Sequence, residues 1–151
     1  PQGSGPATVE LVRPEKREVK LASDVYFPIQ HSMAIIQAAR AGRTILGADL
    51  YDGSETGDKV YSTSTAIGRQ AKPGSKSVAD LDRVPSWPIS VSYFPAGQTQ
   101  GDTVPLYEMS YRFHDNGVTS SLRINHGNFA IVGELKELTY FEASPCKNPV
   151  P

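Results

Sequence analysis

The chain has 151 residues, a length that suits one domain and lets it bury roughly two thirds of the surface that the unfolded chain exposes. Its 15 basic and 16 acidic side chains do not cluster by sign, which argues against a nucleic-acid groove and against binding to an anionic membrane surface. No apolar run of about 18 residues occurs, so we expect neither a membrane-spanning helix nor a retained signal peptide.

Residues 1–17 are predicted to form a flexible leader. The chain opens at Pro1 with glycine- and proline-rich sequence as far as Pro6, a composition typical of a trimmed or cleaved end. Directly after the leader, residues 18–21 alternate in polarity, which predicts a short edge strand.

The next stretch, residues 28–41, predicts the single amphipathic helix of the chain. Ile29, Met33 and Ile36 recur at helical spacing, and the alanines among them favour helix. The proline at the start suits a first helical turn, and Gly42 suits the C-terminal cap.

Beyond Gly42 the hydrophobic pattern has a period of two, which predicts strands. The predicted strands cover residues 43–51, 59–67, 87–94, 106–114, 118–124 and 129–141. A polar turn is expected at 52–58 and an exposed loop at 69–83, while the Asn116-Gly117 pair and residues 126–128 predict tight turns. The last three strands therefore form a meander, whose edge the helix or closure into a barrel would protect.

One face of two predicted strands is strongly apolar and is the candidate binding surface. These side chains either fill an ordinary core or line a concave wall that takes a lipid or a peptide. The candidate ligand-facing residues are Trp87, Val91, Tyr93, Tyr107, Met109, Tyr111 and Phe113.

No pattern in the sequence predicts a catalytic residue, a metal site or a cofactor. His31, His114 and His126 lack metal-ligand spacing, and the carboxylates between Asp49 and Asp58 lack the closing glutamate of a calcium loop. A Gly-x-Ser-x-Gly elbow is also absent, so we expect no enzyme, although a buried Ser-His pair would favour a hydrolase.

Cys146 is the one cysteine of the chain. In a secreted protein an odd thiol suggests a partner outside the chain, whereas in a cytosolic protein it would be an inert exposed thiol. Spacing alone leaves both interpretations open.

In order and spacing, several segments together resemble the EipB-like cell-envelope integrity proteins of alphaproteobacteria, from about Val19 to Cys146. They are Phe27-Pro28 with His31, Ala38-Ala39-Arg40-Ala41-Gly42, Leu50-Tyr51-Asp52-Gly53-Ser54, Ser86-Trp87-Pro88-Ile89-Ser90 with Tyr93-Phe94, and Asn116-Gly117-Val118.

The resemblance implies a mainly β fold: an antiparallel, strongly curved sheet that is half of an open barrel or β-spiral, with the helix packed against it. Residues 18–146 would be the C-terminal half of such a domain, and 147–151 a tail. It further implies a non-enzymatic periplasmic protein that supports envelope integrity and stress resistance. A carrier of a lipid, glycolipid or lipidated segment is the alternative.

The resemblance also implies that Cys146 forms a disulfide with a cysteine in the N-terminal half, which this chain lacks. Such a long loop closure is worth about 4 to 5 kcal/mol in the chain-entropy model. The expected partners are therefore the missing half, an envelope protein or lipid, and a second strand edge through self-association, with no nucleic acid.

Overall fold

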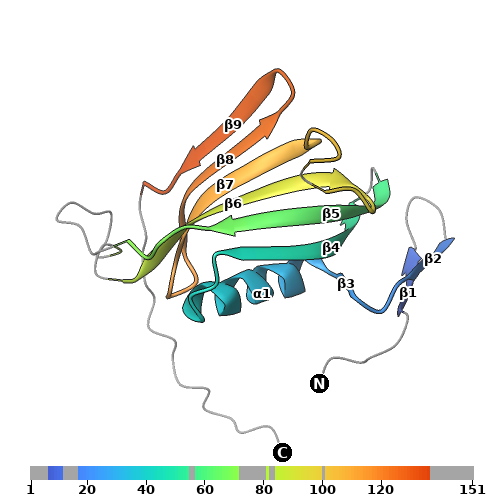
Figure 1. The fold of residues 1–151 in the computed structure, drawn as a ribbon, viewed down its shortest axis with the longest axis horizontal. Coiled ribbons are helices and arrows are strands. Elements are labelled where there is room, and N and C mark those ends of the chain that lie inside the picture. The colour runs from blue at the N-terminus through green and yellow to red at the C-terminus, as the bar shows by residue number, and fades with distance from the viewer. Residues whose placement is uncertain are drawn as a thin grey trace, which may run out of the picture.

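The computed structural model describes residues 7–11, 17–54, 57–71, 81, 84–99 and 101–136. This described part contains one helix, a two-stranded sheet and a seven-stranded sheet (Figure 1). None of its helical structure is long and apolar enough to span a membrane.

The small sheet pairs β1 (Ala7–Leu11) with β2 (Arg17–Leu21) in antiparallel register. The strand predicted at 18–21 is confirmed. The segment predicted as a flexible leader contains a strand of its own, because the alternation of Val9 and Leu11 with polar residues supplies a partner for β2.

The large sheet runs in the order β3-β4-β5-β6-β7-β8-β9, and the described strands do not close it into a barrel. Every neighbouring pair is antiparallel except β3 and β4, which are parallel over two residues. The strands are β3 (Val25–Tyr26), β4 (Ile45–Ser54), β5 (Gly57–Ile67), β6 (Ser86–Pro95), β7 (Tyr107–His114), β8 (Thr119–His126) and β9 (Phe129–Glu134). The predicted fold class, a curved and mainly antiparallel sheet with one helix, is confirmed.

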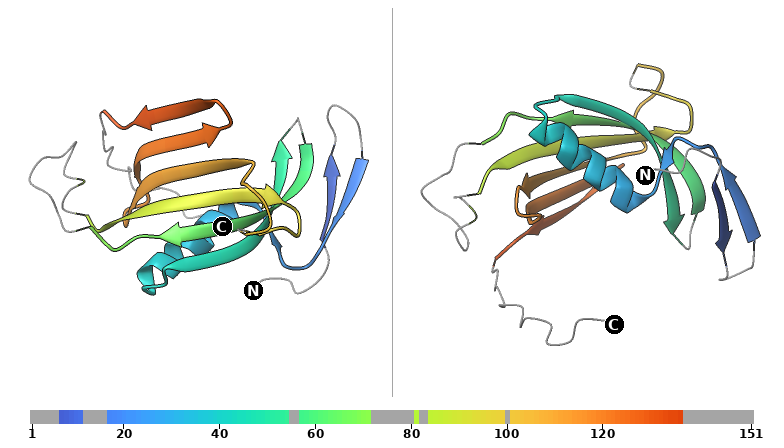
Figure 2. Two further views of the ribbon diagram at one scale, coloured as in Figure 1. Left: turned by 45° about the horizontal axis from the view of Figure 1, so that its top comes forward. Right: turned by 90° about the horizontal axis from the view of Figure 1, so that it is seen from below.

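Helix α1 (Pro28–Arg40) connects β3 to β4, and this connection explains its position. Parallel neighbours need a crossover, so the chain must travel back over one face of the sheet between them. Figure 2 shows α1 lying on the inner side of the curved sheet. The helix ends at Arg40, one residue before the predicted end, and Gly42, whose φ of 70° few other residues adopt, follows the C-cap residue Ala41.

The buried face of α1 differs from the face that the sequence suggested. Of the three residues predicted to share the buried face, Ile29 and Met33 are 71% and 53% exposed and Ile36 is partly buried against the core. The fully buried apolar residues of the helix are instead Ile35, Ala38 and Ala39. The sheet beneath α1 carries large side chains, so small alanines on the helix allow the close approach that dense packing requires.

Two loop predictions also need correction. The polar turn is tighter than residues 52–58, since β4 runs to Ser54 and β5 begins at Gly57. The loop at 69–83 is not wholly exposed: Leu81 is 2% exposed and Ala71 forms an isolated bridge to Ser86. Of the strand predicted to reach residue 141, residues 137–141 lie outside the described part.

A candidate functional site on the apolar face of the sheet

The seven candidate residues all lie on the helix-covered face of β6 and β7, in rows that cross the two strands. The rows pair Trp87 with Phe113, Val91 with Met109, and Tyr93 with Tyr107. Tyr111 completes the set opposite Ile89, and the alternation of period two places all of these side chains on one side.

The seven candidate residues differ in how deeply they are buried. Trp87, Val91, Tyr93 and Phe113 are between 1% and 7% exposed, whereas Tyr107, Met109 and Tyr111 are only partly buried. The first group belongs to the same core as the helix residues Ile35, Ala38 and Ala39. The structure therefore brings the predicted residues together, and contact with a ligand stays a prediction.

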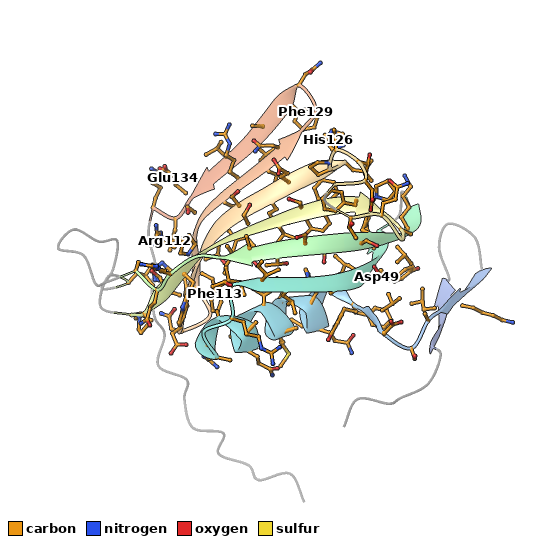
Figure 3. All side chains as sticks on the ribbon, viewed as in Figure 1. Asp49, Arg112, Phe113, His126, Phe129 and Glu134 are labelled. Carbon is orange, nitrogen blue, oxygen red and sulfur yellow. The ribbon has the colours of Figure 1, made fainter. Side chains whose placement is uncertain are left out.

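The apolar face continues beyond the helix onto the last two strands. Met109 is followed by Ile124 on β8 and Ile131 on β9, at matching positions of the register. Ile131 and Phe129 are 54% and 57% exposed. Figure 3 shows His126 and Phe129 at the hairpin that joins these strands, far from α1. The inner face thus changes from a covered core to an open apolar surface.

Aromatic rings form a ladder across the open end of this face. Tyr93 and Tyr107 stack with their ring centroids 4.1 Å apart, and Tyr61 meets both edge-on at 6.1 and 5.8 Å. The ladder continues from Tyr107 to His126 at 6.3 Å and from His126 to Phe129 at 5.2 Å. Such contacts add to the energy of buried area, so the ring contacts stabilise the packing of five neighbouring strands, β5 to β9.

The tyrosines on this face are neutral hydrogen-bond donors at physiological pH. Burial, with a contribution from the charge of Asp52, raises the pKa of Tyr93 to about 12. Burial and then the neighbouring Tyr93 raise the pKa of Tyr111 to about 12, and burial likewise raises the pKa of Tyr107. The surface therefore carries no ionised phenolate that would repel an anionic headgroup.

Two histidines are buried and contact hydroxyl groups. His31 Nε2 lies 3.2 Å from Thr63 Oγ1, whose single proton is donated to the carbonyl oxygen of Ala48 at 2.7 Å. His31 must then donate rather than accept, so it cannot act as a base toward Thr63.

His114 Nε2 lies 2.8 Å from Ser120 Oγ, which is the Ser-His contact that would favour a hydrolase. Its place in the fold gives it another role. Phe113 pairs with Thr119 while Arg112 pairs with Ser121, so Ser120 is the extra residue of a β-bulge. The hydrogen bond braces this bulge at the end of the β7–β8 hairpin.

Among the described residues, no three His, Cys, Asp or Glu side chains gather at a spacing that could hold a metal ion. Cys146 lies outside the described part, so its disulfide stays a prediction. The sequence did not predict that Phe129 and Ile131 belong to the exposed part of the apolar face. They stand in a run of four apolar residues, Phe129-Ala130-Ile131-Val132, which has no alternation that separates one face of the strand from the other.

These features define a class of protein: an open, strongly curved β-sheet whose apolar inner face is half covered by a single crossover helix. The comparisons agree with this class. A crystal structure from Brucella abortus, titled a beta-barrel-like protein of a domain of unknown function, matches with a TM-score of 0.77 and 25% identity, over 93% of this chain and 58% of that one.

The EipB-like family model matches residues 1–142, so the chain belongs to the EipB-like family. A curated relative, the cell envelope integrity protein EipB of Brucella abortus (strain 2308), is 29% identical over 146 residues. That match covers 95% of this chain and 51% of the relative, so the chain spans about half of the relative's length. The relative's name indicates a role in the integrity of the cell envelope.

Proposed function

We propose that this chain acts as part of a non-enzymatic periplasmic protein that supports cell-envelope integrity and stress resistance through structural or protein contacts. The observation that carries the proposal is the half-covered inner face, which ends at the exposed apolar strand β9. A surface of this kind suits a docking role, since an open apolar edge strand is normally paired or covered.

The partner that we propose first is the remaining half of a longer protein, which would pair with β9 and continue the sheet. Cys146 would then lock the two halves by a disulfide. Comparing the mass of the full-length protein before and after reduction and alkylation tests this lock. A freely alkylated Cys146 under oxidising conditions would contradict it.

The envelope role is tested in a bacterium that lacks its own copy of the longer protein. Survival on detergent or on a wall-targeting antibiotic should return with the intact gene. It should not return with a version that carries Ile131→Lys and Phe129→Lys, provided that the periplasmic level of the protein is unchanged. Full rescue by the doubly charged version would count against the inner face as the functional surface.

The non-enzymatic part of the proposal is tested at Ser120. A fluorophosphonate probe labels serines that a neighbouring histidine activates. We expect no labelling, because Ser120 braces a bulge. Stoichiometric labelling that disappears in Ser120→Ala would instead reveal a hydrolase.

A second candidate function, a carrier of a lipid, glycolipid or lipidated segment, is favoured by the exposed Phe129 and Ile131 next to the buried aromatic wall. Native mass spectrometry after extraction from membranes should then show an acyl-chain adduct. Ile131→Asp should remove the adduct and Val132→Asp should keep it, because these neighbours are 54% and 62% exposed but point to opposite faces of β9. A chain that never carries an adduct excludes the carrier.

A further inference from the structure

The structure contains a second cavity, at the edge of the sheet where the short strand β3 meets β4. Its volume is about 790 Å³, within the range of small-molecule sites. The turn before β3, the first turn of α1, strands β4 and β5, and the β6–β7 loop all contribute to it. We propose that this cavity binds a neutral saccharide.

One carboxylate of the cavity is held in place by a chain of hydrogen bonds. The backbone N–H of Gly97 donates to Ser62 Oγ at 2.9 Å, and that hydroxyl donates to Asp49 Oδ1 at 2.7 Å. Ser62 is 9% exposed, so the chain is well shielded. The other oxygen of Asp49 has no hydrogen bond within the described part, and it stays available to accept from a ligand hydroxyl.

Other groups around the cavity have hydrogen-bonding capacity to spare. Gln30 accepts the backbone N–H of Phe27 through Oε1 at 3.0 Å, which leaves its amide N–H groups for another acceptor. The hydroxyl of Tyr26 and the carboxylate of Asp24 also have no partner among the described residues. Tyr26, whose ring is partly buried against the core and lies 6.4 Å from the ring of His31, also lines the cavity, so the lining combines donors, acceptors and an aromatic side chain.

The chemistry of this lining points to a polyhydroxylated ring. Carboxylates accept bonds from neighbouring hydroxyls, amides both donate and accept, and an aromatic ring packs against the C–H face of a sugar. The described lining includes no Lys or Arg, so its two carboxylates would repel a phosphate or an acidic sugar. A neutral ring of one to three sugar units matches both the charge and the volume.

The test is a titration of the isotope-labelled chain with maltotriose and, separately, with tri-N-acetylchitotriose, followed by amide NMR. We expect one of these neutral probes to bind saturably, with shifts confined to residues 23–30, 47–49, 62–63 and 97–99. Asp49→Asn should weaken binding at least tenfold, because it replaces an oriented acceptor with a donor.

The matched control is Glu108→Gln. Glu108 is another half-buried strand carboxylate that accepts a serine hydroxyl from the neighbouring strand, Ser92 Oγ at 3.3 Å, but it does not line the cavity. Its substitution should leave the affinity unchanged. Asp24→Asn serves as a second variant in case Asp49→Asn unfolds, since Asp24 is exposed and its loss should still weaken binding several-fold.

Three outcomes would overturn the proposal: no saturable binding of either trisaccharide, binding that survives both aspartate substitutions, or tight, salt-sensitive binding of spermidine in their place. The last result would assign the cavity to a cationic amine. None of them bears on the envelope role of the apolar face, because the cavity and Ile131 belong to opposite edges of the sheet.

Discussion

Two threonines on the same face of β5 have opposite hydrogen-bonding states. Thr65 is fully buried, and its hydroxyl has no partner in the described structure. Thr63, two residues earlier, donates to the carbonyl of Ala48 and accepts from His31. A buried hydroxyl without a partner loses its hydrogen bonds to water and gains none in the folded state, which costs free energy. A hydrogen bond within the protein offsets this cost for a paired hydroxyl.

Thr65→Val should therefore raise the free energy of unfolding by about 1 kcal/mol, because valine keeps the shape and removes the unpaired hydroxyl. Thr63→Val should lower it by about 1 to 3 kcal/mol, because it leaves the buried His31 N–H unpaired. Urea unfolding followed by circular dichroism measures both. Changes of the same sign in the two variants would show that hydrogen bonding does not separate these sites.

His31 gives the fold an acid-sensitive residue. Burial lowers its pKa below the ordinary value of 6.5, so the folded chain resists a proton that the unfolded chain accepts. The unfolding free energy should then fall as the pH drops below 6.5, by at most about 1.4 kcal/mol per pH unit. Urea midpoints between pH 7.5 and 5 measure this slope. His31→Gln should flatten it, and an unchanged slope would assign the effect to another group.

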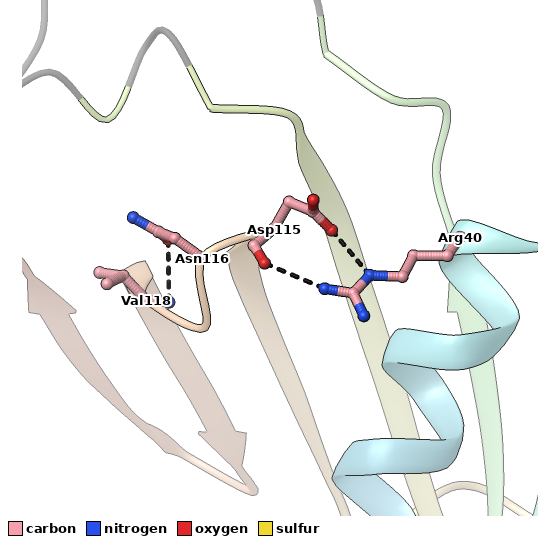
Figure 4. A network of polar contacts seen from close by, with 4 residues as sticks. All are labelled: Arg40, Asp115, Asn116 and Val118. Carbon is pink, nitrogen blue, oxygen red and sulfur yellow. Dashed lines mark hydrogen bonds and ion pairs between the residues drawn. The ribbon is translucent and has the colours of Figure 1, made fainter.

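A polar contact joins the C-terminal end of α1 to the β7–β8 turn (Figure 4). Arg40 Nε donates to Asp115 Oδ1 at 2.7 Å, and a second guanidinium nitrogen donates to the Asp115 carbonyl oxygen at 3.1 Å. The turn itself is ordered by the bond from the Val118 N–H to Asn116 Oδ1 at 3.2 Å. The contact ties the C-terminal end of the helix to the β7–β8 hairpin.

Because the side chains of Arg40 and Asp115 are 54% and 39% exposed, solvent screens the pair. A double-mutant cycle with Arg40→Ala and Asp115→Ala should give a coupling of only about 0.2 to 1 kcal/mol. The coupling should shrink in 1 M NaCl, because salt screens exposed charges. A coupling above 2 kcal/mol that ignores salt would mean that the contact is far less hydrated than its exposure indicates.

The elements themselves could largely be predicted from the sequence, because alternation of period two and the helical spacing after Pro28 are local signals. What could not be predicted depends on partners distant in sequence. The face that α1 buries is decided by the bulky side chains of the sheet, and the pairing of β1 with β2 by a strand that looked like part of a leader. The seven candidate residues on β6 and β7 could be predicted from the alternation of their strands. The exposure of Phe129 and Ile131 could not, because it depends on the position of β9 at the edge of the folded sheet.

Strand β9 forms an edge of the large sheet, and its residues Phe129, Ile131 and Val132 are all more than half exposed. If β9 pairs with another strand in the working protein, its exposed edge should make the isolated chain self-associate at high concentration. Val132→Lys should suppress this self-association. Sedimentation velocity measures both. If the proposed remaining half pairs with β9, the amides of β9 should exchange with solvent more slowly in its presence than in this chain alone. A monodisperse monomer at millimolar concentration, with equal exchange in both forms, would contradict the paired edge.

Trp87 is the single tryptophan of the chain, and it is 7% exposed beside Phe113 on the inner face. The protein thus carries an intrinsic fluorescent reporter inside the core that the helix covers. Displacement of the helix from this core would expose the single indole and change its emission wavelength. A binding event that moves the helix can therefore be followed by tryptophan fluorescence, without an attached dye.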